Sequence, residues 1–337
     1  MARLYFLGMC LNDNDQKLLA VKYLMLALQT KMRQDSMKYV FTELMLTFEE
    51  TRNMVASRAV AKWSICQGES QWQNIYQRPG FVCSGLHQWN CEIRYLHLLK
   101  PHFAPSDEGY PKWCHTLKNH YSVIRDEFLN LLNKTCESSI TASATSHWPQ
   151  VGERVEHDQR IVSGGNWREV VLFGPDVTTF PNSESIAPKT KHLIHTYAPE
   201  VVSLCNQGGG EVIFSMLAPH TYISPHCASS NIRLTAHLGL MVPNKSEKLK
   251  NNKAPSQSRP ACGIRVGNKW HQWNEGDFLV FDDSYEHEVV NDTNECRCVL
   301  LLRFWHPGIP KSSWRVAINE IIEQKKMSDE IRFIPPS

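Results

Sequence analysis

The chain has 337 residues, and its 36 basic and 34 acidic side chains leave a formal net charge of +2. A balance this even argues against a dedicated nucleic-acid binder, which normally carries a basic stripe. The hydrophobic fraction of 42% is typical of a globular protein with a sizeable core, and the length allows two modest domains or one large domain with an appendage. No run of 18 apolar residues occurs, so the sequence predicts no membrane span.

The first residues, MARLYFLGMCLND, contain one Arg and an apolar run that is too short to predict a signal peptide. Either the chain is cytosolic or its true N-terminus lies further upstream. The eleven cysteines show no repeated CxxC spacing, so a zinc ribbon is not favoured.

Residues 1–65 are predicted to be an α-helical appendage. Segments 17–32 and 36–63 are rich in helix-forming residues and contain no Gly or Pro, and Asp35 and Ser36 between them form a candidate N-cap. Two long helices joined by a short turn are the unit of helical repeat arrays. Because a lone pair cannot form a stable solenoid, the sequence favours a helical region that packs on the rest of the chain.

Residues 66–150 are predicted to be a helical and extended segment that packs on the core. Segment 66–112 is scattered with Gly, Pro, Trp and His, which is typical of an extended, turn-rich stretch. Segment 112–134 has the apolar spacing of a helix, and the Ser/Thr-rich segment 135–150 is predicted to be a loop.

Residues 151–310 change to a strand pattern. Seven short segments have β-type composition and are separated by Gly-rich or polar turns. They are 166–174, 209–217, 232–242, 261–268, 276–283, 285–290 and 296–305. No helix-length pattern follows Cys205 within this region, so an antiparallel sandwich or barrel is favoured over a βαβ fold. Residues 243–261 are predicted to be a long flexible loop, and residues 311–337 a C-terminal helix and tail.

Two polar stretches resemble the halves of a metal site. The first runs from Ser215 to His237 and contains His226, and the second runs from Phe281 to Arg297 and contains His287. The alternation from Arg233 to His237 predicts a strand with Arg233, Thr235 and His237 on one face. Neighbouring strands of a barrel would bring the two stretches together.

Two His and one carboxylate are the usual ligands of non-haem Fe(II). His226 and His287 are the candidate pair, but Ala228 stands where the carboxylate is expected, two residues after the first His. Asp282 and Asp283 are candidates for groups that support the ligands, or for turn residues. Since the chain has 15 His, a surface or hydrogen-bonded role for either His is the ordinary alternative.

In several ordered motifs the chain resembles the 2-oxoglutarate-dependent aspartyl/asparaginyl β-hydroxylases. The motifs are Pro225-His226, Arg233, 237–240, 281–289, Arg297 and 305–307. The resemblance extends back through 122–129 and 77–81, and so covers roughly residues 72–310. It implies a mainly β catalytic domain, a double-stranded β-helix or jelly roll, that follows an α-helical N-terminal region.

The resemblance also implies the site residues. His226 and His287 would be the catalytic metal ligands for Fe(II), with water in place of a carboxylate, so that Ala228 fits. Ser215, His237 and Arg297 would bind the cosubstrate 2-oxoglutarate, and O2 would be the second cosubstrate. The chemistry agrees, because a dicarboxylate needs a fixed cation at its far end and an Arg fork supplies one.

Arg233 and Asp283 are predicted to bind substrate. The resemblance implies hydroxylation of the β-carbon of Asp or Asn in a protein partner, with EGF-like modules as the family's substrate. Thr235 stands where the family has a second Arg, and 227–229 replace a Thr-Gly-Pro run, which leaves the substrate open.

Two rival interpretations remain. One is a non-catalytic jelly-roll binding protein that retains the metal ligands, and the other is a helical scaffold in which residues 1–65 carry the function. The resemblance implies the endoplasmic reticulum lumen or membrane if the N-terminus is incomplete, and otherwise the chain is expected in the cytoplasm. No nucleic-acid partner is expected.

Overall fold

The computed structural model describes most of the chain. The described residues are 2–30, 34–68, 70, 72, 74–83, 86, 101–135, 148–149, 161–175, 177–178, 185–243 and 259–333. The predicted loops at 135–150 and 243–261 therefore lie almost entirely outside the described residues. None of the described helices is long and apolar enough to cross a membrane.

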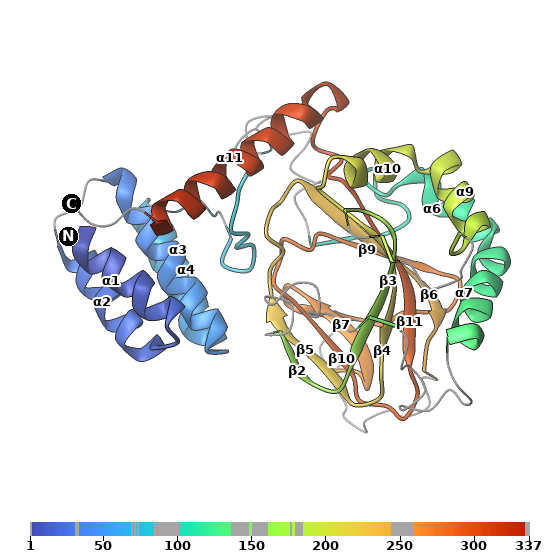
Figure 1. Cartoon of the computed structure of the whole chain (residues 1–337), viewed down its shortest axis with the longest axis horizontal. Helices are drawn as coiled ribbons and strands as arrows, with labels where there is room; N and C mark the ends of the chain where they lie inside the picture. Colours follow the sequence, from blue (N-terminus) through green and yellow to red (C-terminus); the bar gives the residue numbers. More distant parts are fainter. Residues whose placement is uncertain are drawn as a thin grey trace.

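Two antiparallel sheets form the body of the molecule, as Figure 1 shows. The six-stranded sheet has the order β1 (His102–Phe103), β9 (Phe278–Phe281), β6 (Arg233–Met241), β11 (Arg297–Trp305), β4 (Val212–Leu217) and β3 (Trp167–Phe173). The five-stranded sheet has the order β2 (Val162–Gly164), β5 (Thr221–His226), β10 (His287–Asn291), β7 (Cys262–Val266) and β8 (Lys269–His271). The non-consecutive strand order and the facing sheets make this the predicted double-stranded β-helix.

All seven predicted strands are present, as β3, β4, β6, β7, β9, β10 and β11. The sequence did not indicate β5, although this strand carries His226. Its Pro225 argued against a strand, because Pro cannot donate to a ladder. In the structure Pro225 lies where the register between β5 and β10 shifts, so it interrupts no regular pairing.

Alternation along the strands gives each sheet an inner and an outer face. On β11, Leu300 and Leu302 face outward, while Val299 and Leu301 belong to the cluster between the two sheets. On β6, Leu234 and Leu238 face outward. The predicted division of β6 into two faces is therefore confirmed, and its polar residues line the space between the sheets.

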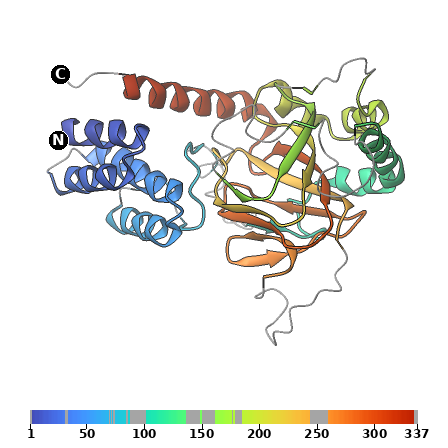
Figure 2. The ribbon, with the colours of Figure 1, turned by 60° about the horizontal axis from the view of Figure 1, so that its bottom comes forward.

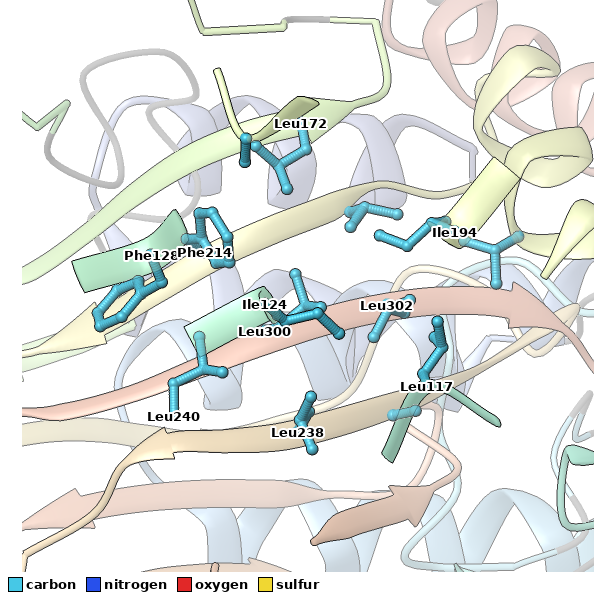
Figure 3. Packing of buried hydrophobic residues seen from close by; sticks show 14 of the residues in the cluster. Leu117, Ile124, Phe128, Leu172, Ile194, Phe214, Leu238, Leu240, Leu300 and Leu302 are labelled. Atoms are coloured by element: carbon cyan, nitrogen blue, oxygen red, sulfur yellow. The ribbon is translucent and has the colours of Figure 1, made fainter. Parts of the chain in front are cut away.

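Four helices cover the outer face of the six-stranded sheet. They are α6 (Lys112–Asn119), α7 (Tyr121–Thr135), α9 (Pro188–Tyr197) and α10 (Pro199–Asn206). Their apolar side chains join those of the sheet in one buried cluster, in which Phe128 packs against Phe214 with ring centroids 5.4 Å apart (Figure 3). The single helix predicted over 112–134 is in fact two, which meet at His120. The sequence also missed α9 and α10, each of which begins with Pro at its first position, where the missing N–H costs nothing.

The N-terminal region contains four helices where two were predicted. They are α1 (Ala2–Asp13), α2 (Lys17–Gln29), α3 (Gln34–Glu50) and α4 (Met54–Gln67). The predicted second helix is broken because Arg52 has a φ of 58° and Asn53 caps α4 by accepting a hydrogen bond from the N–H of Ala56 at 3.1 Å. The predicted cap at Asp35 and Ser36 is wrong, since α3 already begins at Gln34. The result is two successive helical hairpins.

The helical hairpins lie to one side of the barrel, and two segments connect them to it (Figures 1 and 2). Residues 74–83, here called the strap, run from α4 across the edge of the barrel. The C-terminal α11 (Trp314–Phe333), which follows a short 3-10 turn (Lys311–Ser313), extends from the barrel toward the hairpins. Gln324 of α11 hydrogen-bonds to both the N–H and the C=O of Val82 at 3.1 and 2.8 Å, which joins the two segments.

Candidate metal and cosubstrate site

The two predicted metal ligands lie side by side at the ends of paired strands. His226 is the last residue of β5, and His287 is the first residue of β10 directly opposite it. Their ring centroids are 4.1 Å apart. His287 is buried and His226 is partly buried, so the pair is shielded from bulk water. Residues 61 positions apart in the sequence thus form one cluster.

Hydrogen bonds fix the tautomers of both rings. Nδ1 of His226 lies 2.8 Å from the carbonyl oxygen of Ser224, and Nδ1 of His287 lies 2.8 Å from that of Tyr285. A carbonyl can only accept, so each Nδ1 carries the proton and each Nε2 carries the lone pair. Burial lowers the pKa of His287, although Asp283 opposes this, and the ring is therefore neutral at pH 7. The ring of His287 is thus in the form that a metal ion requires, and Nδ1 of His226 is bonded to a carbonyl in the same way.

The described residues contain no cluster of three or more His, Cys, Asp or Glu side chains that could hold a metal ion. The donor set of the pair is therefore two imidazole nitrogens. Two imidazole nitrogens fit a metal that also takes small oxygen ligands, as Fe(II) does. Asp283 is held elsewhere: its Oδ2 accepts from the hydroxyl of Thr235 at 3.0 Å and pairs with Arg233 at 3.4 Å.

Arg297 begins β11, and its side chain is buried on the inner face of the six-stranded sheet. Its Nε and Nη1 atoms have no hydrogen-bond partner among the described residues. The guanidinium instead lies over the ring of Trp273, 4.6 Å from its centroid. Burial lowers the pKa of Arg297, but an Arg stays charged in any protein, so two charged donors remain without an acceptor.

His237 supplies another unpaired donor in the same interior. Its Nδ1 accepts from the indole N–H of Trp273 at 3.2 Å, so its Nε2 carries the proton, and that Nε2 has no partner in the described part of the chain. Burial, together with the charge of Arg297, lowers the pKa of His237 well below its usual value and keeps the ring neutral. Phe281 contacts the rings of both His237 and His287, with centroids 5.1 and 5.7 Å away.

Ser215 completes the group from β4. It lies opposite Val299, two residues along from Arg297 and on the same face, so the two side chains are diagonal neighbours across the strands. The hydroxyl oxygen accepts from the indole N–H of Trp167 at 2.9 Å, which leaves the hydroxyl hydrogen to donate. Ser215, His237 and Arg297 thus bring buried donors to the inner face of one sheet, and an anionic acceptor fits them.

Arg233 and Asp283 lie beside the histidine pair. Arg233 donates to the carbonyl of Gly209 at 3.0 Å, and Asp283 also lies 3.8 Å from Nε of Arg303. Burial alone would raise the pKa of Asp283, but Arg233 and Arg303 outweigh it and lower the pKa, so the carboxylate is ionised. Its Oδ1 is buried with no partner among the described residues. The role of this pair in substrate binding stays a prediction.

The sequence motifs included Phe281 without assigning it a role, and they did not indicate Trp167 and Trp273, two other side chains of this interior. Trp273 lies in a turn after β8 and contacts both His237 and Arg297, while Phe281 and Trp167 contact His287 and Ser215 respectively. Trp273 and Trp167 are 106 residues apart in the sequence, and no spacing rule links them. Only the closed sheet brings them to one pocket.

Comparisons with known proteins agree with this geometry. A family model described as aspartyl/asparaginyl beta-hydroxylase matches residues 118–307. A human protein named aspartyl/asparaginyl beta-hydroxylase is 27% identical over 241 residues, which are 71% of this chain and 27% of that protein. The chain therefore spans about a quarter of the length of that relative.

A protein of Rhizobium tropici, named ornithine lipid ester-linked acyl 2-hydroxylase, is 38% identical over 195 residues, or 58% of each chain. Among solved structures, a prolyl-4-hydroxylase of Pseudomonas putida covers 61% of this chain and 90% of its own at 14% identity, with a TM-score of 0.31. With a TM-score this low, the comparison supports no conclusion about function.

Proposed function

Because the chain belongs to the aspartyl/asparaginyl β-hydroxylase family, we propose that it is an Fe(II)- and 2-oxoglutarate-dependent dioxygenase that hydroxylates the β-carbon of Asp or Asn residues in a protein substrate. The observation that carries the proposal is the pairing of two features in one interior. A pair of adjacent His rings, each held through Nδ1 by a backbone carbonyl, offers metal-binding nitrogens, and buried donors without partners among the described residues lie in the same interior.

The proposal assigns each residue a task. His226 and His287 would hold Fe(II), and the bound metal would supply oxygen activation while 2-oxoglutarate is oxidised to succinate and CO2. Arg297 and Ser215 would hold the far carboxylate of 2-oxoglutarate, because a guanidinium and a hydroxyl donate to carboxylate oxygens in a fixed geometry. His237 would donate from Nε2 to the cosubstrate nearer the metal.

Trp273 and Phe281 would keep this space dry and oriented. The indole N–H of Trp273 fixes the tautomer of His237, and its ring face supports the charge of Arg297. Phe281 packs against both His287 and His237. Excluding water strengthens each charge-assisted bond in the pocket.

The unpaired Oδ1 of Asp283 supports a substrate with an N–H donor near the metal, such as a peptide or an Asn amide. Asp283 already balances the positive charge of Arg233, and Thr235 carries no charge. The site therefore offers less positive charge to an acidic side chain than it would with a second Arg at position 235. EGF-like modules are the substrate that the family suggests.

A second candidate substrate is the acyl chain of a lipid. It is favoured by the higher identity, 38%, to the relative that is named as a lipid acyl hydroxylase. A non-catalytic binding protein that keeps the ligands is the alternative to any enzyme.

One assay separates these possibilities. Purified chain is incubated with Fe(II), O2 and 2-oxoglutarate, and succinate is measured with Asp peptide, Asn peptide, acyl lipid or no substrate. The proposal expects succinate to rise with a peptide, and hydroxylated peptide to appear in equal amount. If succinate forms only with the acyl lipid, the substrate is a lipid and not a protein. If the chain binds 2-oxoglutarate but forms no succinate with any substrate, it is a binding protein.

A further inference from the structure

The strap contacts both loops that carry the predicted metal ligands. On the His226 side, the N–H of Phe81 donates to the carbonyl of Ser229 at 2.8 Å, three residues after the histidine. On the His287 side, the N–H of Glu286 donates to the carbonyl of Tyr76 at 2.6 Å, one residue before the histidine. The ten-residue strap therefore joins the segment that follows His226 to the segment that precedes His287.

Side chains strengthen the second contact. The amide of Gln77 donates to the hydroxyl of Ser284 at 2.9 Å and to Asp282 at 3.3 Å, and Gln77 forms a backbone bridge with Tyr285. Tyr285 is the residue whose carbonyl fixes the tautomer of His287. The strap thus acts on the turn that orients the ligand ring.

The helical region holds the strap through a buried ion-pair network. Arg78 is buried, and its guanidinium lies 2.7 Å from Glu49 of α3 and 2.8 Å from Glu286. Arg58 of α4 reaches the other oxygen of Glu286 at 3.1 Å, where Arg265 of β7 also donates at 2.9 Å. Both helices of the second hairpin are therefore bonded, directly or through Arg78, to the residue that precedes His287.

The charges in this network are balanced. Three guanidiniums, of Arg58, Arg78 and Arg265, meet three carboxylates, of Glu49, Glu286 and Glu288. Buried charges of this kind are stable only when each is paired, so removing one partner forces the others to move. Because Glu286 and His287 are adjacent in the chain, a displacement of Glu286 would also move His287.

We propose that Arg58 and Arg78 are positioning residues for the metal centre: the helical region holds the strap, and the strap holds His226 and His287 at the spacing that binds metal. The inference rests on the proposed function, since it takes these histidines as metal ligands. It assigns the helical region a direct part in the metal site, whatever further role that region has.

Arg58 is the residue to change. Arg78 and Glu286 are fully buried, and loss of either would leave uncompensated charge that threatens folding. Arg58 is 29% exposed and makes one ion pair to Glu286, so Arg58→Gln should fold. Lys118→Gln is the matched control, because Lys118 is also a partly exposed cation that pairs between elements, with Asp277 at 2.5 Å, away from the strap.

The experiment is a titration of the metal-free full-length chain with Co(II), an air-stable substitute for Fe(II), alongside a Tm measurement. Changes in groups that orient metal ligands typically cost 10–100-fold in affinity, so Arg58→Gln should raise the Kd for Co(II) by about 10-fold. Lys118→Gln should keep the wild-type Kd, and Arg58→Lys, which retains the charge, should recover most of the affinity.

Two outcomes would overturn the inference while the metal site stands. Arg58→Gln could bind Co(II) as tightly as the wild type, or Arg58→Gln and Lys118→Gln could lose affinity equally in step with Tm, which would mark a general loss of stability. If the wild-type chain itself binds no Co(II), the proposed function fails and this inference fails with it.

Discussion

The guanidinium of Arg297 is buried, and its Nε and Nη1 have no acceptor among the described residues. A charged group in that setting is costly unless an anion joins it. The neighbours in sequence do not help, because Glu295 is exposed in the preceding turn and Cys296 and Cys298 are buried thiols. The charge of Glu169, buried on β3 opposite Ser215, opposes the lowering of the Arg297 pKa, but Nε and Nη1 remain without an acceptor in the described part of the chain. The proposed cosubstrate carboxylate would satisfy these two atoms.

Arg297→Lys should raise the half-saturating concentration of 2-oxoglutarate about 10- to 100-fold, because Lys keeps the charge but loses the planar pair of donors, a loss of about 1.5–3 kcal/mol. Ser215→Ala should give a smaller rise. Succinate production measured against 2-oxoglutarate tests both. Arg125→Lys on the outer helix α7 makes the same chemical change away from the pocket and should leave the requirement unchanged. An unchanged half-saturation in Arg297→Lys would mean that another residue holds the far carboxylate.

Trp273→Phe isolates the tautomer of His237. The ring under Arg297 is retained, but the N–H that donates to Nδ1 of His237 is lost. We expect a rise of about 5-fold in the 2-oxoglutarate requirement, from the loss of about 1 kcal/mol, with Co(II) affinity unchanged. Trp113→Phe is the control, since the indole N–H of Trp113 is buried without a partner among the described residues. Equal effects of the two substitutions would remove the tautomer argument.

At the scale of elements, the break between α3 and α4 depends on a single cap. Asn53→Ala removes the oxygen that accepts from the N–H of Ala56 and should destabilise the helical region by about 1 kcal/mol. Urea unfolding followed by circular dichroism measures the change. Asn53→Asp keeps an acceptor and should remain close to the wild type. If Asn53→Ala were neutral, the break would be fixed by packing of the two helices and not by the cap.

The elements also show what sequence can and cannot predict. The seven strands were predictable because each has apolar or alternating character, and β6 in particular has two chemically distinct faces. Strand β5 was not predictable, because a Pro such as Pro225 is unfavourable in a paired strand. In the structure the register shift at this point leaves Pro225 outside the regular pairing. The break at Asn53 was missed because the apolar helical pattern continues through it, and the cap was visible only as one polar residue.

The candidate site divides in the same way. The residues proposed to bind metal and cosubstrate lie in motifs with fixed spacing, so the sequence could indicate His226, His287 and Arg297. Trp273 acts only through contacts with residues far away in the chain, as do the contact of Phe281 with His237 and the ion pairs of Glu286 with Arg58 and Arg78. Long-range pairs of this kind have no local signature, and the fold is needed to reveal them.

For the whole molecule, the barrel and the helical region share one network of contacts. The strap, the α4 residue Arg58 and the α11 residue Gln324 all meet at the edge of the barrel that bears the histidine pair. The outer helices α6, α7, α9 and α10 stiffen the opposite sheet, so the donors of that sheet are held at a fixed distance from the metal ligands. The architecture thus places the donors of one sheet and the histidine pair of the other around one interior.

Metal binding by the histidine pair is tested directly by Fe(II) titration. Anaerobic Fe(II) titration of the wild type, followed by equilibrium dialysis, should give one tightly bound ion per chain. His226→Ala and His287→Ala should each abolish or strongly weaken that binding, because each removes one of two protein nitrogens. His220→Ala, a change at an exposed histidine whose side chain is 64% exposed, should bind Fe(II) like the wild type. Wild-type affinity in His287→Ala would contradict the account.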